Sequence, residues 1–287
     1  MIWSVSVDLD GLGCYAAIHG LRISLDDRAL RAVPEVALGR FCELFAAERA
    51  PATFFAIGRE VQYAPNALRE AGRAHEIGSH SFSHDYALSR RTPADISVDL
   101  QKCEEALVGA GIDKPRGFRA PGYTISARLL DAVRERGYLY DSSLLPSPGY
   151  YALKAVALAA YALRGRASQS ILGAPGQLFS RRGPHLRRGL RELPIATLPV
   201  LRVPVIGTVV QAAPWTARMG AAGGHLNLEL HGIDLLDQSD VPSGIAAAQP
   251  GLRLAASEKV KRLRALLRSL PGEPRTLEQA ARMLLPV

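Results

Sequence analysis

Short apolar runs recur along the chain and are separated by longer stretches in which apolar residues follow helical spacing. Alternation and β-branched residues predict a strand at residues 2–7, and residues 52–57 form a short apolar run closed by Gly58. Similar runs predict strands at residues 76–79, 117–119, 138–141 and 225–231, and residues 193–206 are β-like but interrupted by proline. Helices are predicted at residues 34–48, 66–73, 92–109, 126–137, 150–163 and 258–270, with a short one after residue 276.

Several predicted helices begin at a residue suited to capping. The predicted N-caps are Thr92, Ser126, Ser257 and Thr276. The repeated order of strand, loop and helix predicts an α/β fold with a parallel sheet wrapped by helices, either a barrel or a doubly wound sheet. In both folds the chemistry lies at the carboxyl ends of the strands.

The composition is that of a globular protein, with 48% hydrophobic and 22% charged residues among 287. It excludes a disordered or collagen-like chain, and we expect one domain over residues 1–287. The longest apolar stretch, residues 150–163, is broken by Lys154 and is shorter than the ~20 residues that span a bilayer. The chain begins without a basic leader or apolar signal region, and its cysteines, Cys14, Cys42 and Cys103, lack disulfide or zinc-knuckle spacing. We therefore expect a cytoplasmic protein.

Positive charge is concentrated in one segment. The formal net charge is +8, and the stretch between Asp141 and Glu192 holds eight basic residues and no acidic one. Because the rest of the chain is balanced, a nucleic-acid-coating protein is a poor description. We interpret residues 142–192 as a basic insertion, a helix followed by a loop. Its arginines, in residues 164–191, either contact a phosphate-bearing substrate or an anionic membrane, or form a solvated loop beside a packed helix.

Two carboxylates follow the first predicted strand. Asp8 and Asp10 are two residues apart, so both side chains can face the same side of a strand end. One could bind a metal while the other acts as a base. The alternative is an ordinary loop cap or turn.

Two histidines follow the third predicted strand. His80 and His84 have the four-residue spacing that puts two imidazoles on one face of a helical turn, a metal-pair geometry. They could also be two exposed histidines near a helix start. Together with Asp10 they would form a site of two histidines and one carboxylate, which suits catalytic Zn²⁺ and also Fe²⁺, Mn²⁺ or Co²⁺.

Further polar residues follow two other predicted strands. Arg119 precedes a Pro-Gly-Tyr turn and can hold an ionised carboxylate, while the turn at Gly122 and Tyr123 could present N–H groups to an oxyanion. His231 ends the last strand and could act as a general acid. A surface arginine and a structural histidine are the alternatives.

In this order, these segments resemble the polysaccharide deacetylase family, the NodB-homology metal-dependent amidases and esterases, from Val5 to about Ile233. His-Ser-Phe-Ser-His and Arg-Ala-Pro-Gly-Tyr carry most of the resemblance. It implies a distorted (β/α)7 barrel, with the basic insertion and C-terminal helices over residues 257–287 added, and hydrolysis of an N-acyl group on an amino sugar.

The resemblance also implies roles for individual residues. Asp8 matches the catalytic base, Asp10, His80 and His84 match the ligands of one divalent metal ion, and Arg119 matches the arginine that orients the base. His231 matches the general acid, and Asp141 in Tyr-Asp-Ser-Ser matches the acid that tunes it. The metal would polarise the amide carbonyl and lower the pKa of its bound water from about 15.7 toward 7.

The motifs depart from the family pattern in three places. Asp8 and Asp10 are separated by Leu9, where the family usually has adjacent aspartates; this variant occurs in a branch with cyclic-amide hydrolases and lipid-linked sugar deformylases. Gly122 is an extra residue before Tyr123, and the fourth motif lacks its usual tryptophan.

We therefore predict a metal-dependent hydrolase that removes an acetyl or formyl group from an amino sugar, free or lipid-linked. The alternatives are a hydrolase of allantoin-like cyclic amides, a glycosyltransferase that uses Asp8 and Asp10 to hold a metal nucleotide, and an inactive sugar-recognition module.

Overall fold

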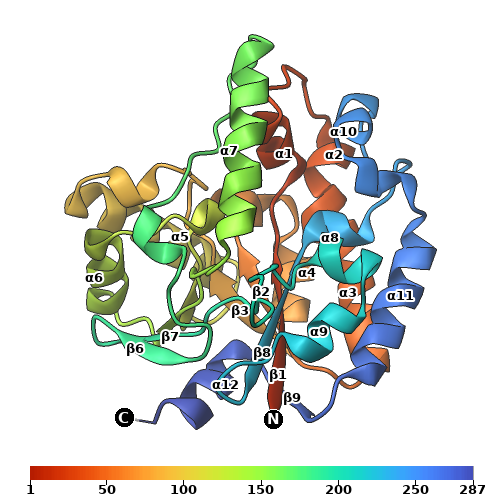
Figure 1. The fold of residues 1–287 in the computed structure, drawn as a ribbon. Helices are drawn as coiled ribbons and strands as arrows, with labels where there is room; N and C mark the ends of the chain where they lie inside the picture. The colour runs from red at the N-terminus through yellow and green to blue at the C-terminus, as the bar shows by residue number, and fades with distance from the viewer. Residues whose placement is uncertain (287) are drawn as a thin grey trace.

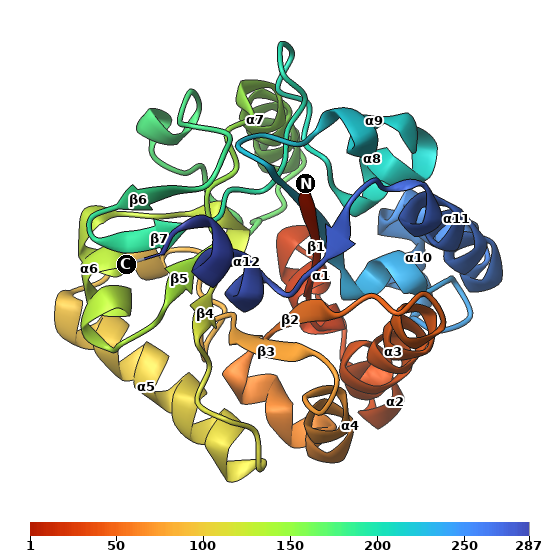
Figure 2. The same ribbon diagram turned by 90° about the horizontal axis from the view of Figure 1, so that it is seen from below.

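A parallel sheet that curls into an incomplete barrel forms the centre of the structure, a computed structural model that describes residues 1–286 (Figures 1 and 2). The strands are β1 Ile2–Asp8, β2 Ala52–Ala56, β3 Glu76–Ser79, β4 Gly117–Phe118, β5 Tyr140–Asp141, β6 His185–Arg187, β7 Leu190–Glu192, β8 His225–His231 and β9 Glu273–Pro274. They lie in the order β6-β7-β5-β4-β3-β2-β1-β8, with β9 beside β1. Among the strands of residues 1–286, only the pair β6 and β7 is antiparallel. The predicted α/β fold, a distorted barrel, is confirmed.

Helices surround this sheet, as the view from below shows (Figure 2). They are α1 Leu12–Ile18, α2 Asp27–Arg31, α3 Leu38–Ala47, α4 Pro65–Ala71, α5 Pro93–Gly109, α6 Ala127–Glu135, α7 Pro148–Leu163, α8 Gly207–Ala212, α9 Trp215–Met219, α10 Ser243–Ala248, α11 Ala256–Ser269 and α12 Leu277–Leu284. A π-helical turn, Ala32–Ala37, runs directly into α3. Short 3₁₀ turns are Gly58–Tyr63, Leu88–Arg90, Pro121–Tyr123, Pro175–Gln177, Gly232–Leu235 and Pro250–Arg253.

Strand β1 is the central strand, and its alternation separates two environments. Val5 and Val7 are fully buried and belong to the hydrophobic cluster that contains Phe41 and Phe45 of α3. The intervening residues are polar and lie opposite polar residues of β8: Ser6 Oγ donates to Asn227 Oδ1 at 3.0 Å. The parallel register continues to the strand ends, where Asp8 lies beside His231. Every second residue in this part of β1 is thus polar and faces the barrel interior, and this row of polar side chains ends at the carboxyl end of the strand.

The segment predicted as an insertion contributes to the sheet. Its last residues form β7, which pairs with β5, and β6 and β7 form a hairpin where a loop was predicted. Beyond β7 the chain stays extended without a regular strand, with isolated bridges such as that between Ile206 and Glu229. Ala196 N donates to Asn227 O at 3.0 Å, so this extended segment helps to close the barrel beside β8.

Most predicted caps are correct, and one is not. The side chains of Thr92, Ser126 and Thr276 accept hydrogen bonds at the starts of α5, α6 and α12. Helix α11 instead begins at Ala256, one residue before the predicted cap Ser257. Asp237 from a distant loop accepts from Ala256 N at 3.0 Å and so supplies the capping oxygen.

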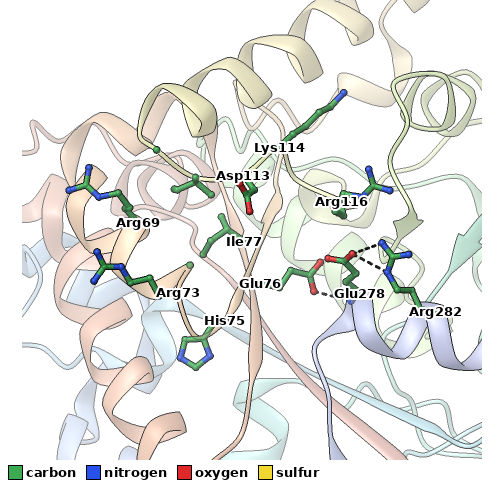
Figure 3. Close-up of a pocket in the computed structure, with 13 residues that line it drawn as sticks. Arg69, Arg73, His75, Glu76, Ile77, Asp113, Lys114, Arg116, Glu278 and Arg282 are labelled. Atoms are coloured by element: carbon green, nitrogen blue, oxygen red, sulfur yellow. Dashed lines mark hydrogen bonds and ion pairs between the residues drawn. The ribbon is translucent and has the colours of Figure 1, made fainter.

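A cavity of about 650 Å³ lies at the end of the sheet where the strands begin (Figure 3). Glu76, the first residue of β3, and Arg116, just before β4, both line it. Charges of both signs occur there and partly neutralise each other, as in the pair Arg282–Glu278 at 2.7 Å. This cavity is remote from the carboxyl ends of the strands. Among the described residues, no helix has the length and hydropathy needed to cross a bilayer.

Candidate active site

The carboxyl ends of four strands bring the predicted site residues together. Asp8 ends β1, His80 directly follows β3, Arg119 directly follows β4 and His231 ends β8. All four of these side chains are at least three-quarters buried. Because parallel strands end at one edge of the sheet, residues far apart in sequence become neighbours there.

Asp10, His80 and His84 converge on one point. The Asp10 Oδ1 atom lies 3.3 Å from His80 Nε2 and 3.1 Å from His84 Nε2. His80 Nδ1 donates to the carbonyl oxygen of Arg119 at 2.8 Å, which leaves the lone pair of Nε2 directed at Asp10. Burial alone would raise the pKa of Asp10, but the two imidazoles hold it well below its usual range.

The donor atoms of this cluster fit a divalent cation. Asp10 Oδ1 and His84 Nε2 are buried and have no hydrogen-bond partner, although burial of unsatisfied polar atoms is costly. One ligand atom from each of Asp10, His80 and His84 lies within 4.8 Å of the others. Two imidazole nitrogens and a carboxylate oxygen form a donor set that Zn²⁺ and other first-row metals accept.

The His80–His84 loop is not the helical turn that the spacing predicted. Ser81 and His84 both have left-handed backbone conformations, with φ of 63° and 50°. The carboxylate of Asp99 on α5 accepts from Phe82 N at 2.8 Å and from Ser83 N at 3.1 Å, which holds the loop in this shape. The two imidazoles meet because the loop curls back, with ring centroids 4.9 Å apart.

Arg119 fixes the second carboxylate of the first motif. Its Nη1 donates to Asp8 Oδ1 at 2.7 Å, and neither side chain is exposed by more than 2%. The guanidinium also donates to Ser142 O and Ser6 Oγ, at 2.8 and 2.9 Å, and its centre lies 4.4 Å from the Phe55 ring centroid. Every edge of the guanidinium is therefore engaged, and Asp8 is held beside a permanent positive charge.

Glu229 is a site residue that the sequence interpretation missed. It is fully buried on β8, accepts from the Tyr123 hydroxyl at 2.7 Å and lies 4.0 Å from His231 Nε2. Burial and the neighbouring Asp8 raise the pKa of Glu229 to about 7, against the lowering effect of His231 and Arg119. Asp8, Glu229 and His231 also lie close enough to share an ion, but Arg119 lies 3.7 Å from Glu229 and already supplies the cation there.

The pKa of His231 is raised by its surroundings. Burial alone would lower its pKa, but the carboxylates of Glu229, Asp8 and Asp10 raise it to about 9. Asp234 accepts from His231 N at 2.8 Å and so fixes the backbone at the end of β8. The side chain stays 24% exposed, so it can reach a ligand in the site.

Asp141 does not contact His231 in the part of the chain that the structure describes. It accepts from Ser143 Oγ and pairs with the carboxyl group of Glu192, both fully buried. Burial raises the pKa of Asp141, and burial together with Asp141 raises that of Glu192 well above its usual range, so the pair shares a proton. The carboxylate beside His231 is that of Glu229.

The Pro-Gly-Tyr turn reaches the site through a side chain. Gly122 and Tyr123 both have left-handed backbones, with φ of 58° and 61°. Tyr123 N donates to Ala120 O at 3.1 Å within the turn, so this amide is already engaged. The Tyr123 hydroxyl, in contrast, lies 3.3 Å from His231 Nε2.

Part of this chain is similar in sequence to known proteins. Residues 23–140 match the family model for polysaccharide deacetylase. A peptidoglycan deacetylase of Helicobacter pylori is 30% identical over 146 residues, which cover 48% of this chain and 48% of that protein. A chitooligosaccharide deacetylase of Azorhizobium caulinodans is 35% identical over 100 residues, 33% of this chain and 46% of that protein.

The resemblance to the polysaccharide deacetylase family is confirmed. This chain spans about half the length of the two relatives that it matches. A Mycobacterium smegmatis protein assigned to the polysaccharide deacetylases has the same fold, with a TM-score of 0.64 at 18% identity, over 99% of this chain and 89% of that one. A CE4 family pseudoenzyme of Bacillus anthracis aligns with a TM-score of 0.52 at 11% identity, over 98% of this chain and 65% of that one.

The sequence signal for Glu229 lies in the alternation of β8. Within Leu-Glu-Leu-His, Glu229 and His231 are two residues apart and face the same side of the strand. In this chain, which lacks the fourth-motif tryptophan, the acid facing His231 comes from the same strand as that histidine.

Proposed function

We propose that this protein is a metal-dependent hydrolase that removes an N-acetyl or N-formyl group from an amino sugar. The main support for the proposal is that a metal-type cluster and a separate acid–base pair lie together at one edge of the sheet. A buried metal-type cluster, Asp10 with His80 and His84, lies next to a carboxylate fixed by arginine and a histidine whose pKa is raised. The sequence relatives, which are named as deacetylases, support the same reaction class.

We propose that Asp10, His80 and His84 hold one divalent ion, with Zn²⁺ the first choice and Fe²⁺, Mn²⁺ or Co²⁺ as alternatives. When bound, such an ion would polarise the acyl carbonyl and make water a better nucleophile. The protein supplies a buried site and a fixed His80 tautomer, through the 2.8 Å bond from Nδ1 to Arg119 O.

Asp8 is proposed to act as the base. Its Oδ1 bonds to Arg119, whereas its Oδ2 lies 3.7 Å from His80 Nε2 and so faces the metal-type cluster. A water attacking the acyl carbon there would pass its proton to Asp8, while the other oxygen of Asp8 stays bonded to the buried guanidinium.

His231 is proposed to donate a proton to the leaving amine. It is protonated because its pKa is about 9, and Glu229 and the Tyr123 hydroxyl orient its ring. Gly122 and Tyr123 are proposed to border the acyl oxygen as it becomes negative. The Tyr123 hydroxyl donates its one proton to Glu229, so it would have to turn away from that bond to meet the oxyanion.

Release of acetate or formate from N-acylated amino sugars, measured with stoichiometric appearance of the free amine, tests the proposal. Activity that is lost in Asp8→Asn while metal content is kept would support it. If the wild-type protein hydrolyses allantoin-like rings but no acylated sugar, the cyclic-amide alternative replaces it. Nucleotide-sugar binding by calorimetry would favour the glycosyltransferase, and a metal-loaded protein without turnover on any of these would be a sugar-recognition module.

We also propose that the substrate is lipid-linked, that the protein contacts an anionic membrane, and that it is located in the cytoplasm. Several arginines of residues 164–191 have partners within the chain: Arg182 bonds to Thr197, Arg188 to Asp131 and Arg191 to Leu285 O. Arg164 and Arg166, at the end of α7, remain exposed. Helix α7 itself exposes Leu163, directly before Arg164, and Leu153 farther back along the helix, 89% and 74%.

An apolar helix face with cations at its tip is suited to the surface of an anionic bilayer. Co-sedimentation with phosphatidylglycerol vesicles should weaken in the double variant Arg164→Ala, Arg166→Ala and stay unchanged in Arg188→Ala. Equal sedimentation with neutral and anionic vesicles would contradict the membrane proposal.

A further inference from the structure

Helix α7 stands at the carboxyl edge of the sheet and borders the candidate site (Figure 1). At its start, the Tyr150 ring packs edge-on against the ring of Tyr123, with centroids 5.7 Å apart. Near its end, the Tyr161 hydroxyl lies 2.8 Å from Nδ1 of His19, which follows α1. One face of α7 is therefore fixed against the mouth of the barrel.

Lys154 lies on this inner face, one helical turn after Tyr150. Its Nζ atom lies 3.4 Å from the carbonyl oxygen of Gly122 and 5.9 Å from the centroid of the Tyr150 ring. Both contacts are with residues at the rim of the site. The amine is thus held next to the turn that carries Tyr123.

No carboxylate of the described residues lies within ion-pair distance of Lys154. Its own segment has no acidic residue between Asp141 and Glu192. The side chain is partly buried, and this burial lowers the pKa of Lys154 to about 8. Removing a cation from water without an anion is unfavourable, and a ligand that brings an anion to Lys154 would relieve this cost.

The amine also has unused bonding capacity. An ammonium group has three N–H donors, and the Gly122 carbonyl accepts one of them. The other two can point to a ligand that enters the site beside Tyr150. An anionic oxygen group is the partner that satisfies both the donors and the charge.

We propose that Lys154, together with Tyr150, forms a subsite for an anionic group, a phosphate or a carboxylate, carried by the amino-sugar substrate. This inference rests on the proposed deacylase function, because it concerns the substrate of that same site. Lys154 acts on specificity: it recognises a part of the substrate away from the bond that breaks. The preferred substrate is an acidic amino sugar and not a neutral oligosaccharide.

The test separates recognition from turnover. Calorimetry with the metal-loaded protein compares amino sugars without an acyl group: glucosamine, its 1-phosphate and 6-phosphate, and muramic acid for the carboxylate. The wild-type protein should bind at least one acidic sugar about tenfold or more tightly than glucosamine, the range for hydrogen bonds to charged groups. Lys154→Met should remove this preference, and Lys154→Arg should keep most of it.

Lys261→Met is the matched control, since it removes the same charge from an exposed position on α11. It should leave the preference unchanged. A parallel assay measures KM and kcat on the N-acetyl forms, where Lys154→Met should raise KM for the acidic sugar only.

Three results would overturn the proposal: a wild-type protein with no preference for any acidic sugar, a preference that survives Lys154→Met, or an equal loss on neutral and acidic sugars. The last would mean that Lys154 only anchors α7 to the Gly122 turn. If the protein binds acidic sugars through Lys154 but releases no acetate or formate, the proposed reaction fails while the subsite stands.

Discussion

Replacing Glu229 with glutamine removes one negative charge beside the proposed general acid. Glu229 Oε1 lies 4.0 Å from His231 Nε2, and the glutamine amide oxygen can still accept from the Tyr123 hydroxyl at the position now 2.7 Å away. Because the pKa of Glu229 is about 7, its carboxylate is charged in the range where His231, with a pKa of about 9, loses its proton. The substitution therefore acts on the alkaline side of the pH profile.

The size of the pKa change at His231 follows from the distance between the charges of Glu229 and His231. Two unit charges 4 Å apart interact by about 1 kcal/mol in water and about 4 kcal/mol at an effective dielectric constant of 20. Since one pKa unit corresponds to about 1.4 kcal/mol, the pKa of His231 should fall by roughly one to three units. His231 is partly exposed, and Asp8 and Asp10 remain to raise its pKa, so we expect the lower part of this range.

The assay is kcat for acetate release as a function of pH, with metal content measured at each point. A proton donor must be protonated, so activity falls as pH rises through the pKa of His231. In Glu229→Gln this fall should begin at least about one pH unit lower, so the ratio of kcat at pH 9 to kcat at pH 6 should be about fivefold or more below that of the wild type. Asp141→Asn is the matched control, another fully buried carboxyl group in the same barrel.

The sequence resemblance assigns the tuning of His231 to Asp141, whereas the geometry assigns it to Glu229. A profile that shifts in Asp141→Asn and not in Glu229→Gln would refute the geometric reasoning. A profile that shifts in neither would show that His231 does not donate the proton in the rate-limiting step.

Three further outcomes are expected at the site. Asp8→Asn should lower kcat by a factor of about a hundred or more, typical of losing a general base, while inductively coupled plasma analysis finds the metal still bound. Asp10→Asn should instead lose the metal. The opposite pattern would mean that the two roles are exchanged. Arg119→Met leaves Asp8 buried without its partner and should lower the free energy of unfolding by about 3–5 kcal/mol in urea titrations, an expectation that an unchanged midpoint would contradict. Removing the metal with a chelator should lower the melting temperature. An ion that binds only the folded state stabilises it by about 2.7 kcal/mol when its concentration is a hundred times its Kd. Identical melting curves with and without chelator would argue against a metal at Asp10.

Six of the strands, β1 to β5 and β8, and most helix caps could be predicted because their signals are local. Thr92 and Thr276 cap α5 and α12 with bonds that span three residues. The His80–His84 loop could not be predicted in this way, since Ser81 and His84 adopt left-handed backbones that usually mark glycine or asparagine. Their conformation depends on Asp99, which lies on the next helix and accepts from the loop amides.

The same distinction explains why the position of Asp141 and the contacts of Glu229 could not be predicted. Asp141 finds its partner in Glu192, and that contact depends on β7 joining the sheet beside β5, which no local pattern indicated. Glu229 was recognisable as facing the same side as His231, but its role depends on Tyr123 and Arg119 from a different strand end. Sequence motifs identify residues that are related by a fixed spacing along the chain. Contacts between residues on different strands can be predicted only when the order and register of the strands are known.

The pairing of β1 with β8 has a consequence for how the protein is made. Asp8 and His231 are direct neighbours in the sheet, yet the whole chain between them must be synthesised before they can meet. Until β8 arrives, one side of β1 exposes unpaired backbone groups, an edge at which nascent chains tend to aggregate. Asp8 and His231 therefore come together only at a late stage of folding, and an intermediate that still lacks β8 leaves this edge of β1 open to other chains.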